Sequence, residues 1–597
     1  MIVATTSYRP RIGAAMRKTA LRRDVAALAA GAALAAMLAP AAAQDALRAV
    51  PPRDATQSVP SLRGAEPFPV MPDAGGCCGA PPAVAQAPSQ QLPQSTTPKP
   101  AGSFRLQAVR FSGATAVDPA ELDALAAAYV GRDVTLGDLE QLAQQVTGLY
   151  RSRGYFLAQA LVPVQTVRDG AVEISVVEGR LGKVEVNVAD DAPITEARVR
   201  GFLAALRPGE AVNAARYERA MLLLSDQPGI KVASGLEEGV APGTSDLVVD
   251  VTAAPRVSFA IDGDNHGTRE SGRVRVGGTM RVNSPLGIGD NLDLRAMVSD
   301  GNALNYGRAS YEAPLGQDGL RLGLGVSRVR YELSGPLAAL GAQGRATVFD
   351  ASLNYPLIRQ RNQNLFLRAG LDQKDLKDDL DAYAYTADKR VRGLGLGWSW
   401  ELRDSLLGGG YWASTGTLYR GRLDIQDDLT RALDQGALGY HTEGGFTKLT
   451  WQFSRLQAIA ARHTLYVSVG GQFASRNLDA SEKLALGGAR AVRAYPSSEM
   501  LMDDGVIGTI EWRWAATEDL TPYLFYDAGR GKLAHSPLPT DGDNTRSMQG
   551  YGVGAVWSRP GNFSVNVSLA WRNNSPAPVT DGGDRKPRIF VQMQKVF

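Results

Sequence analysis

The chain has 597 residues, enough for several domains. Lysine and arginine number 64 against 61 acidic residues, and a net charge of +3 indicates neither a nucleic-acid partner nor an acidic tail. The two cysteines, Cys77 and Cys78, are adjacent, which excludes a disulfide framework and a zinc site.

The first part of the chain, residues 1–43, is typical of a secretory signal peptide. A basic segment from Arg17 to Arg23 precedes an apolar stretch from Val25 to Leu38, and small residues at 41–43 offer a cleavage site. Met16 is an alternative start, because the residues before it are atypical of a signal. The apolar stretch is short for the alternative, a membrane-spanning helix. No later run reaches eighteen apolar residues, so strands must make any further membrane contact.

Residues 44–101 are rich in Pro, Ala, Gln and Ser and lack periodicity, which predicts a flexible periplasmic linker. Cys77 and Cys78 lie within it. A strained vicinal disulfide and a pair of free thiols both remain open for them.

Residues 102–179 are predicted to form a small α+β domain in the order strand, helix, helix, strand, strand. Asp118 is a suitable helix N-cap, and Gly154 is a suitable residue to end the second helix. The predicted elements are a strand at 104–111, a helix beginning at Asp118, a helix from Leu136 to Arg153, and strands at 155–164 and 172–177.

Residues 180–254 repeat this order. There is no room for a third unit before the pattern changes at residue 255. The predicted elements are strands at 181–188, 230–236 and 246–252, with helices at 194–206 and 213–224.

From residue 255 to 597 the helical period disappears, and segments of about ten residues alternate between an apolar face and a small or polar face. About sixteen such segments, with all eight tryptophans after Pro255, predict an antiparallel transmembrane β-barrel with aromatic girdles. A tryptophan-rich soluble β domain is the alternative. Charges on the second face, such as Arg273, Arg275 and Arg281, would be unfavourable against lipid, so that face must line water.

The turns of this region alternate in length. Short Gly/Pro-rich turns at 284–290 and 558–561 are expected on the periplasmic side. Long polar segments, expected outside the cell, occur at 373–389, 424–440, 476–504 and 535–548.

One of these long segments, 476–504, is predicted to fold into the barrel. Its stretch 486–496 contains two glycines, two arginines and a Tyr-Pro pair, which suits neither a strand nor a helix. Alternation along the strand at 523–529 puts Asp527 on the polar face, where an ionised carboxylate needs a cationic partner. Arg493 is the candidate. Such a pair either latches the loop for transport or only stiffens the barrel.

The sequence offers little for catalysis. Its four histidines are isolated, and it has neither a nucleophile elbow nor a phosphate-binding loop. The acidic run at 424–428 is more typical of a solvated loop than of a calcium site. No metal, no cofactor and no enzymatic activity are expected.

Two groups of motifs give a family resemblance that extends from about Phe104 to Phe597. Val492-Arg493-Ala494-Tyr495 and the later Phe525-x-Asp527-x-Gly529 resemble the Val-Arg-Gly-Tyr/Phe and Phe-x-Asp-x-Gly motifs of two-partner secretion transporters, the TpsB family. That family belongs to the superfamily that includes the Bam insertase. The second group resembles its POTRA domains and consists of Tyr150, Arg153, Gly154, Tyr155, Glu178 and Gly179. Ala494 stands where the family usually has glycine, and alanine is unfavourable at positive φ.

The resemblance implies a mixed fold: two periplasmic α+β POTRA domains followed by a barrel of about 16 strands. It implies that the barrel conducts a partner exoprotein of the haemolysin or adhesin type, with no ATP use, after the POTRA domains capture its unfolded N-terminal secretion domain. Val492 to Tyr495 with Phe525, Asp527 and Gly529 would form the loop latch. The arginines Arg273, Arg275, Arg281 and Arg490 would line the pore, or the first three would be ordinary lumen residues.

Other expected partners are outer-membrane lipid and lipopolysaccharide, and the barrel-assembly machinery during biogenesis. No nucleic acid is expected. Relatives often begin with a plug helix, for which Asp45 to Val50 is a weak candidate. Two alternatives are a porin, which predicts no periplasmic domains, and a barrel-assembly factor, which predicts more POTRA units and a glycine at position 494.

Overall fold

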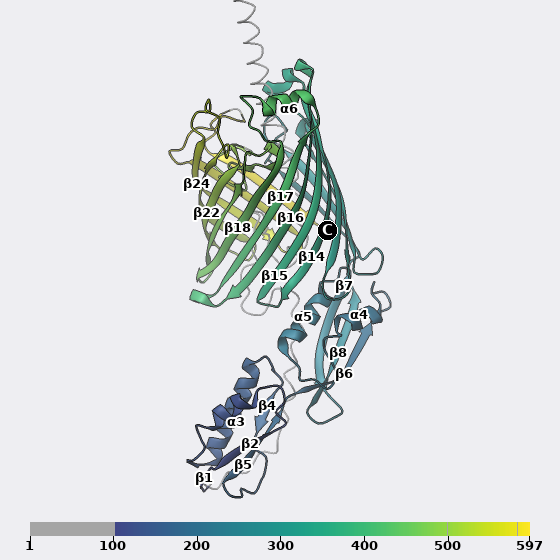
Figure 1. Cartoon of the computed structure of the whole chain (residues 1–597), viewed down its shortest axis with the longest axis vertical. Helices are drawn as coiled ribbons and strands as arrows, with labels where there is room; N and C mark the ends of the chain where they lie inside the picture. Colours follow the sequence, from purple (N-terminus) through teal and green to yellow (C-terminus); the bar gives the residue numbers. More distant parts are fainter. Residues whose placement is uncertain (1–101, 498, 582) are drawn as a thin grey trace, which may run out of the picture.

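The structure is a computed structural model that describes residues 102–597, except 498 and 582. Two small α+β units follow one another below a tall β-barrel, as Figure 1 shows. The predicted signal peptide, the linker with Cys77 and Cys78, and the plug candidate Asp45 to Val50 lie outside the described residues.

The first unit folds as predicted in order, with two helices over a three-stranded sheet. Asp118 accepts a hydrogen bond from the Ala120 amide, and Thr135 and Asp138 form a reciprocal capping box. The second helix packs on the core of the unit through buried Leu142, Val146 and Tyr150. The elements are β1 (Phe104–Arg105), β2 (Ala108–Ser112), α2 (Pro119–Ala126), β3 (Asp133–Val134), α3 (Leu136–Ser152), β4 (Gln159–Leu161) and β5 (Ala171–Val177).

The second unit has the same topology. Its sheet order is β6-β8-β7, with β6 parallel and β7 antiparallel to β8, which matches β2-β5-β4 in the first unit. The elements are β6 (Arg180–Val188), α4 (Glu196–Phe202), α5 (Ala214–Ser225), β7 (Ile230–Glu238) and β8 (Thr244–Ala253). Helix α4 is shorter than the predicted 194–206 because Leu203 and Leu206 reach the core from the turn that follows it.

The rest of the chain forms a closed antiparallel barrel of sixteen strands, which confirms the predicted fold class. The first and last strands, β9 and β26, close it through five paired residues, fewer than any other neighbouring pair in the barrel. The strands are β9 (Val257–Asp264), β10 (Arg275–Asn283), β11 (Asn291–Ser299), β12 (Leu304–Pro314), β13 (Arg321–Glu332), β14 (Ala342–Arg359), β15 (Gln363–Leu380), β16 (Tyr385–Asp404), β17 (Gly410–Ile425), β18 (Gly444–Ala460), β19 (His463–Ala474), β22 (Asp504–Trp514), β23 (Leu520–Lys532), β24 (Thr545–Arg559), β25 (Phe563–Arg572) and β26 (Arg588–Val596).

Short elements connect these strands. An amphipathic helix, α6 (Asp428–Gln435), caps the top of the barrel in Figure 1. The others are the two short strands β20 (Leu484–Ala485) and β21 (Leu501–Met502) and the 3-10 turns η1 (Asp300–Asn302), η2 (Gly335–Leu340), η3 (Asp381–Tyr383), η4 (Leu406–Gly408) and η5 (Ala480–Glu482).

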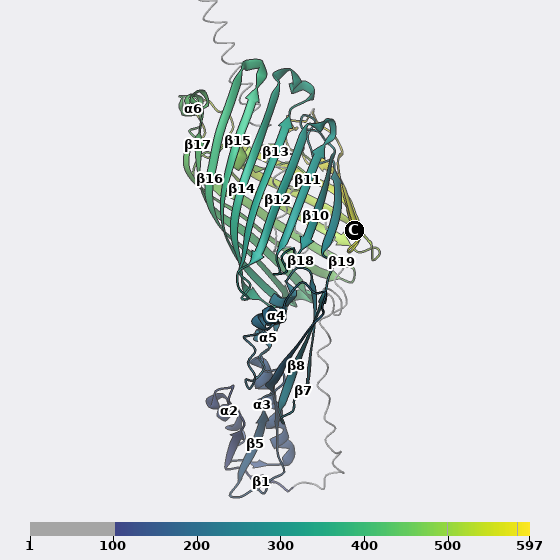
Figure 2. The same ribbon diagram turned by 90° about the vertical axis from the view of Figure 1, so that its right-hand side faces the viewer.

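One predicted loop is wrong. Residues 373–389 form a continuous hairpin, with β15 and β16 joined only by 381–384. Polar residues in this stretch resemble those of a loop, but cross-strand pairs such as Arg390 with Asp375 satisfy the charges on the outer face. The strands of this wall, which faces the viewer in Figure 2, therefore continue well past the ten residues expected of each.

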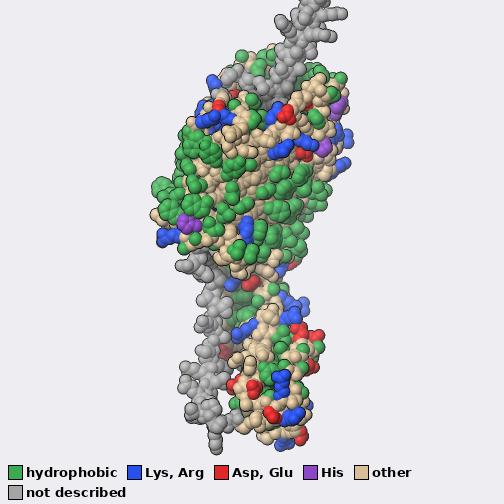
Figure 3. Space-filling view, turned by 90° about the vertical axis from the view of Figure 1, so that its left-hand side faces the viewer, with side chains coloured by type: hydrophobic (Ala, Val, Ile, Leu, Met, Phe, Trp, Pro, Cys, Tyr) green, Lys and Arg blue, Asp and Glu red, His purple; other side chains and the backbone are tan. Residues whose placement is uncertain are grey.

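The outer surface of the barrel carries a belt of apolar side chains. In Figure 3 hydrophobic side chains cover the middle of the barrel, with most charged groups above and below. Within residues 102–597 no helix is both long and apolar enough to cross a membrane.

The lower end of the barrel rests on the second unit. Arg359 at the end of β14 holds both carboxylate oxygens of Asp226, at 2.8 and 2.7 Å. Arg219 of α5 donates to the Pro356 carbonyl at 2.8 Å. These contacts place the short turns on the same side as the two α+β units, as the sequence predicts.

Candidate functional site

The segment between β19 and β22 folds back into the barrel. Its own backbone hydrogen bonds shape it: the Leu486 amide donates to the Met500 carbonyl and the Val492 amide to the Leu486 carbonyl, both at 3.0 Å. Leu486, Val492 and Tyr495 are almost completely buried in a cluster with residues of β23 and β24. We call residues 475–503 the inner loop.

Arg493 joins the tip of the inner loop to the barrel wall. Its Nε and Nη2 donate to the two carboxylate oxygens of Asp527 at 2.8 and 2.7 Å, and its backbone amide donates to the same group at 3.1 Å. Its Nη1 donates to Glu511 at 2.7 Å. Arg513 pairs with the other oxygen of Glu511, so two cations balance two carboxylates. The fork of the guanidinium suits this bidentate geometry, which lysine cannot reproduce.

Glu511 is the member of this site that the sequence reasoning missed. Alternation along β22 puts Glu511 on the lumen face beside Thr509, which donates to Asp527 at 2.9 Å. The signal that could have identified Glu511 is a carboxylate that faces the lumen on β22, the strand that pairs with β23.

The other motif residues pack around this ion pair. The Arg493 guanidinium lies 3.5 Å from the centre of the Phe525 ring. Gly529 leaves room for the inner loop, since a Cβ there would collide with Leu486 and approach Val492. Ala494 is not among the residues with positive φ, so the strain expected at this position is not found.

Tyr495 and the return segment of the inner loop fasten it to a second extracellular loop. The Tyr495 hydroxyl donates to the Pro576 carbonyl at 2.7 Å. Buried Glu499 accepts from the amides of Val579 and Thr580 at 3.0 and 3.1 Å. The loop between β25 and β26 is thereby tied to the inner loop.

The base of the inner loop is anchored on another part of the wall. Glu482 lies between Lys374 of β15 and Lys448 of β18, at 2.6 and 2.8 Å. Asp479 pairs with Lys389 of β16 at 2.8 Å. The inner loop therefore spans from β15, β16 and β18 to β22 and β23. The sequence reasoning missed this base anchor because polar side chains of one inward face cannot be paired without knowing the strand register.

The predicted lumen arginines are compensated by carboxylates. Arg275 pairs with Asp264, Arg281 with Asp293, and Arg273 with Asp581 of the loop between β25 and β26. Arg490 lies exposed in the inner loop and is not part of the Arg493 cluster. The structure thus brings Arg493, Phe525, Asp527 and Gly529 together and leaves the four other arginines elsewhere.

The POTRA-like motif residues lie where the two α+β units meet. Glu178, only 3% exposed, accepts from the Thr115 and Ala116 amides, the Thr115 hydroxyl and the Tyr150 hydroxyl. Burial by itself raises the pKa of Glu178, but these hydrogen bonds outweigh it and hold the pKa below its usual value. Burial, and then the bond to Glu178, raises the pKa of Tyr150.

The same motif connects helix α3 to helix α5. Arg180 donates to Glu178 at 2.8 Å and to the Gly209 carbonyl of the second unit at 2.8 Å. The Gly154 carbonyl, just past α3, accepts from the Ala214 amide at the start of α5 at 2.8 Å. Gly154 and Gly179 have φ of +89° and +67°, which glycine adopts without strain. Arg153 pairs with exposed Glu121, and the Tyr155 ring packs edge-on against Tyr150.

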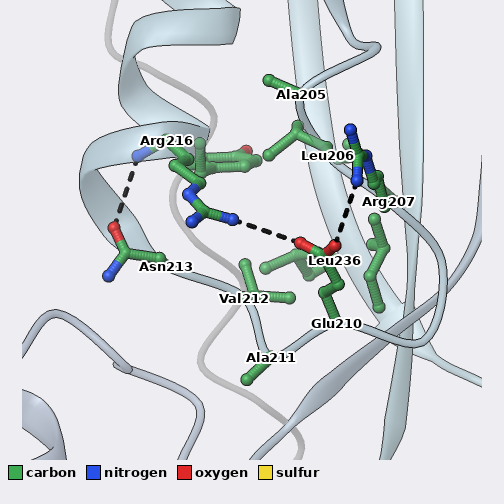
Figure 4. Close-up of a pocket in the computed structure, with 12 residues that line it drawn as sticks. Ala205, Leu206, Arg207, Glu210, Ala211, Val212, Asn213, Arg216 and Leu236 are labelled. Carbon is green, nitrogen blue, oxygen red and sulfur yellow. Dashed lines mark hydrogen bonds and ion pairs between the residues drawn. The ribbon is translucent and has the colours of Figure 1, made fainter. Parts of the chain in front are cut away.

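A pocket opens on the second unit close to this joint (Figure 4). Leu206, Val212 and Leu236 give it apolar walls. On its rim Glu210 lies between Arg216 and Arg207, at 3.1 and 3.8 Å. Such a pocket suits an apolar side chain better than a charged ligand.

Among the described residues, no group of three or more His, Cys, Asp or Glu side chains could hold a metal ion.

Comparisons with known proteins agree with this architecture. Residues 243–556, just over half of the chain, match the family model described as haemolysin secretion/activation protein ShlB/FhaC/HecB. Residues 104–179 match the POTRA domain, ShlB-type.

Similar proteins include the heme/hemopexin transporter protein HuxB of Haemophilus influenzae strain 86-028NP, which is 27% identical over 79% of this chain and 82% of its own length. The outer membrane transporter CdiB of Dickeya dadantii is 25% identical over 79% of this chain and 84% of its own. The solved structure of CdiB from Escherichia coli has the same fold, with a TM-score of 0.67, 20% identity, and coverage of 86% of this chain and 93% of that one. The chain therefore belongs to the ShlB/FhaC/HecB family of haemolysin secretion/activation proteins, the two-partner secretion transporters of the outer membrane.

Proposed function

We propose that the chain moves one partner exoprotein, of the haemolysin or adhesin type, across the outer membrane. The observation that carries this proposal is the inner loop, which crosses the lumen and is fastened to it at both ends, above two POTRA-like units. A barrel so arranged can hold its lumen closed and open it for a client that the units deliver. Other bacterial transporters with this architecture, such as HuxB and CdiB, are named for comparable tasks.

We propose that the second unit receives unfolded client at the free edge of β7. That edge is unpaired in the described structure, since β7 pairs only with β8. An extended segment could add to it through backbone hydrogen bonds, which do not require a strict sequence. The pocket in Figure 4, with Leu236 of β7 in its wall, would accept an apolar side chain of the same segment.

The Arg493 cluster would act as the latch of the inner loop. Seven hydrogen bonds join Arg493 and its neighbours, and two cations balance two carboxylates. The latch is therefore stable until a client or a movement of the second unit supplies other partners. The lumen arginines 273, 275 and 281 would then line the route of the client, with their carboxylate partners keeping the lining nearly neutral.

Further parts of the proposal concern energy and partners. The transporter would use no ATP, and folding of the exoprotein outside would draw it through. Lipopolysaccharide and outer-membrane lipid would surround the barrel, and the barrel-assembly machinery would insert it. The absence of enzymatic activity is part of the same proposal.

Two observations bear on the alternatives. A diffusion porin has no use for periplasmic units of this kind, the second of which is fixed to the barrel by the pair of Asp226 and Arg359. A barrel-assembly factor would be expected to carry more POTRA units than these two.

The test is secretion of the co-encoded exoprotein by cells with the wild type, Arg493→Ala, Arg490→Ala, or a deletion of Phe104 to Ala253. Barrel insertion is checked by heat-modifiable gel mobility. Export is supported if Arg493→Ala and the deletion insert but leave the exoprotein in the periplasm, while the exposed Arg490 control secretes normally. Unchanged secretion with reduced small-solute permeability would favour the porin.

A further inference from the structure

A row of cations crosses the outer wall of the barrel near its extracellular end. Arg330 of β13 lies directly opposite Arg345 of β14, and Arg345 lies directly opposite Lys377 of β15. Arg328 is two residues from Arg330 on the same face of β13. Like charges directly opposite one another in antiparallel strands destabilise the sheet, so this arrangement needs a compensating anion.

The neighbouring acidic groups do not supply one. Asp379 lies 3.8 Å from Lys377, at the end of the row. Asp375, next along β15, is taken by Arg390 at 2.5 Å. Within the described residues, no carboxylate lies within ion-pair distance of Arg328, Arg330 or Arg345, although Glu332 shares their face of β13.

All three arginines point away from the lumen. Val329 and Tyr331, which alternate with Arg328 and Arg330, are 0% and 5% exposed and face inward, and so does Ala346 beside Arg345. The arginines themselves are exposed on the outer face. They lie on the wall of β13 to β15 that faces the viewer in Figure 2.

The row lies just above the apolar belt. On the same face of these strands, Leu324, Phe349 and Leu371 are 50%, 51% and 61% exposed. From Arg321, at the periplasmic end of β13, nine residues lead to Arg330, which is about 30 Å along the strand. With a tilt of about 40°, the rise along the barrel axis is about 23 Å, close to the apolar height of about 25 Å in such barrels.

We propose that Arg328, Arg330 and Arg345, with Lys377 beside them, bind the phosphate groups of a phosphorylated lipid of the outer leaflet. At this height the acyl chains would lie against Leu324 and Phe349, and the phosphates would meet the guanidinium groups. Guanidinium groups hold phosphate oxygens in bidentate fashion and stack against a flat β surface without a deep pocket. The Thr347 hydroxyl, opposite Arg328, adds a hydrogen-bonding group to the same surface.

This proposal rests on the outer-membrane location of the barrel and not on protein export. Arg330 and Arg345 face lipid and have no contact with the inner loop, so a variant that loses lipid and still secretes the exoprotein supports it. Unchanged secretion by the Arg493 variant would overturn the proposed function and leave this one unaffected.

The test compares the full-length protein, purified in detergent, with R330Q/R345Q. The matched control is R530Q/K532Q, which removes the same charge from exposed, outward positions at the extracellular end of β23. There the paired residues are Val506, Asp504, Thr545 and Ser547, and none is a cation. Each protein is mixed with bisphosphorylated lipid A, dephosphorylated lipid A, or excess inorganic phosphate. Lipid retained by native mass spectrometry and the midpoint of thermal unfolding are measured.

We expect R330Q/R345Q to retain about tenfold less bisphosphorylated lipid A than the wild type and the control do. We also expect the order of the two unfolding midpoints to depend on lipid. Without lipid, R330Q/R345Q should unfold at the same temperature as the wild type or at a higher one, because the repulsion between the two arginines is gone. With bisphosphorylated lipid A, the wild type should have the higher midpoint. Equal retention by wild type and R330Q/R345Q would overturn the proposal. The proposal would also be overturned if the wild type retained dephosphorylated lipid A as well as it retains bisphosphorylated lipid A. Full stabilisation of the wild type by inorganic phosphate alone would overturn it too.

Discussion

The methyl group of Ala494 occupies the space that a side chain at Gly550 would need. A Cβ built on Gly550 would lie 2.5 Å from the Cβ of Ala494, closer than carbon atoms approach one another. Ala494 on the inner loop and Gly550 on β24 are therefore complementary. The alanine that departs from the family motif is accommodated by a glycine on the wall.

This complementarity predicts the effect of Gly550→Ala. We expect the added methyl group to push the inner loop from the wall and lower the free energy of unfolding by about 1–3 kcal/mol. The double variant Ala494→Gly/Gly550→Ala should recover most of that loss. The urea midpoint of barrel unfolding, followed by heat-modifiable gel mobility, measures both. If the double variant is no more stable than Gly550→Ala alone, the two residues are not coupled.

Replacement of Arg493 by lysine should be nearly as harmful as replacement by alanine. A single ammonium group cannot hold both oxygens of Asp527 and also reach Glu511, so one buried carboxylate is left unpaired. Breaking a buried pair costs about 3–5 kcal/mol. Unfolding and secretion should both be measured, with Arg490→Lys in the same loop as the control. A lysine variant that matches the wild type in both would show that charge alone suffices.

The base anchor gives a prediction of its own. Glu482→Gln should leave Lys374 and Lys448 close together without the carboxylate that separates their charges. We expect the base of the inner loop to detach while Arg493 still holds its tip. Hydrogen exchange at 478–486 should rise, while exchange at 490–495 should stay slow. A rise across the whole inner loop would show that the two anchors open together.

The sequence was informative wherever one element carries its own pattern. Alternation and turn lengths predicted the barrel and its sixteen strands, and helical spacing with caps predicted the helices of both units. Arg493 was predicted as the partner of Asp527 because an ionised carboxylate on the polar face of a strand needs a cation, and the loop at 486–496 supplies one. The hairpin of β15 and β16 was mistaken for a loop because its strands are polar on the outer face above the membrane.

Relationships between strands could not be predicted in this way. Glu482 needs Lys374 and Lys448, which are 108 and 34 positions away and become neighbours only when the barrel closes. Arg330, Arg345 and Lys377 form a row only in the register that the structure gives. Gly154 was recognised as a motif residue, but the hydrogen bond that its carbonyl accepts from the Ala214 amide depends on how the two units stack.

Glu178 should make the stability of the two units depend on pH. In the folded protein the pKa of Glu178 is below its usual value of 4.5, so the folded state favours the charged carboxylate. The stability that this contributes is fully present above the pKa of the unfolded chain and is lost as the pH falls through the lower pKa of the folded state. At pH 7, Glu178→Gln should therefore lower the free energy of unfolding by about 1–3 kcal/mol, because the amides of Thr115 and Ala116 lose an ionised acceptor. The difference in the free energy of unfolding between wild type and variant should stay constant down to about pH 5 and become smaller below pH 4.5.

Denaturant unfolding of residues 102–254, followed by circular dichroism between pH 3 and 7, measures this difference. Glu121→Gln is the control, because its exposed pair with Arg153 should contribute little at any pH. A gap that does not change with pH would mean that the shape of Glu178, and not its charge, holds the joint.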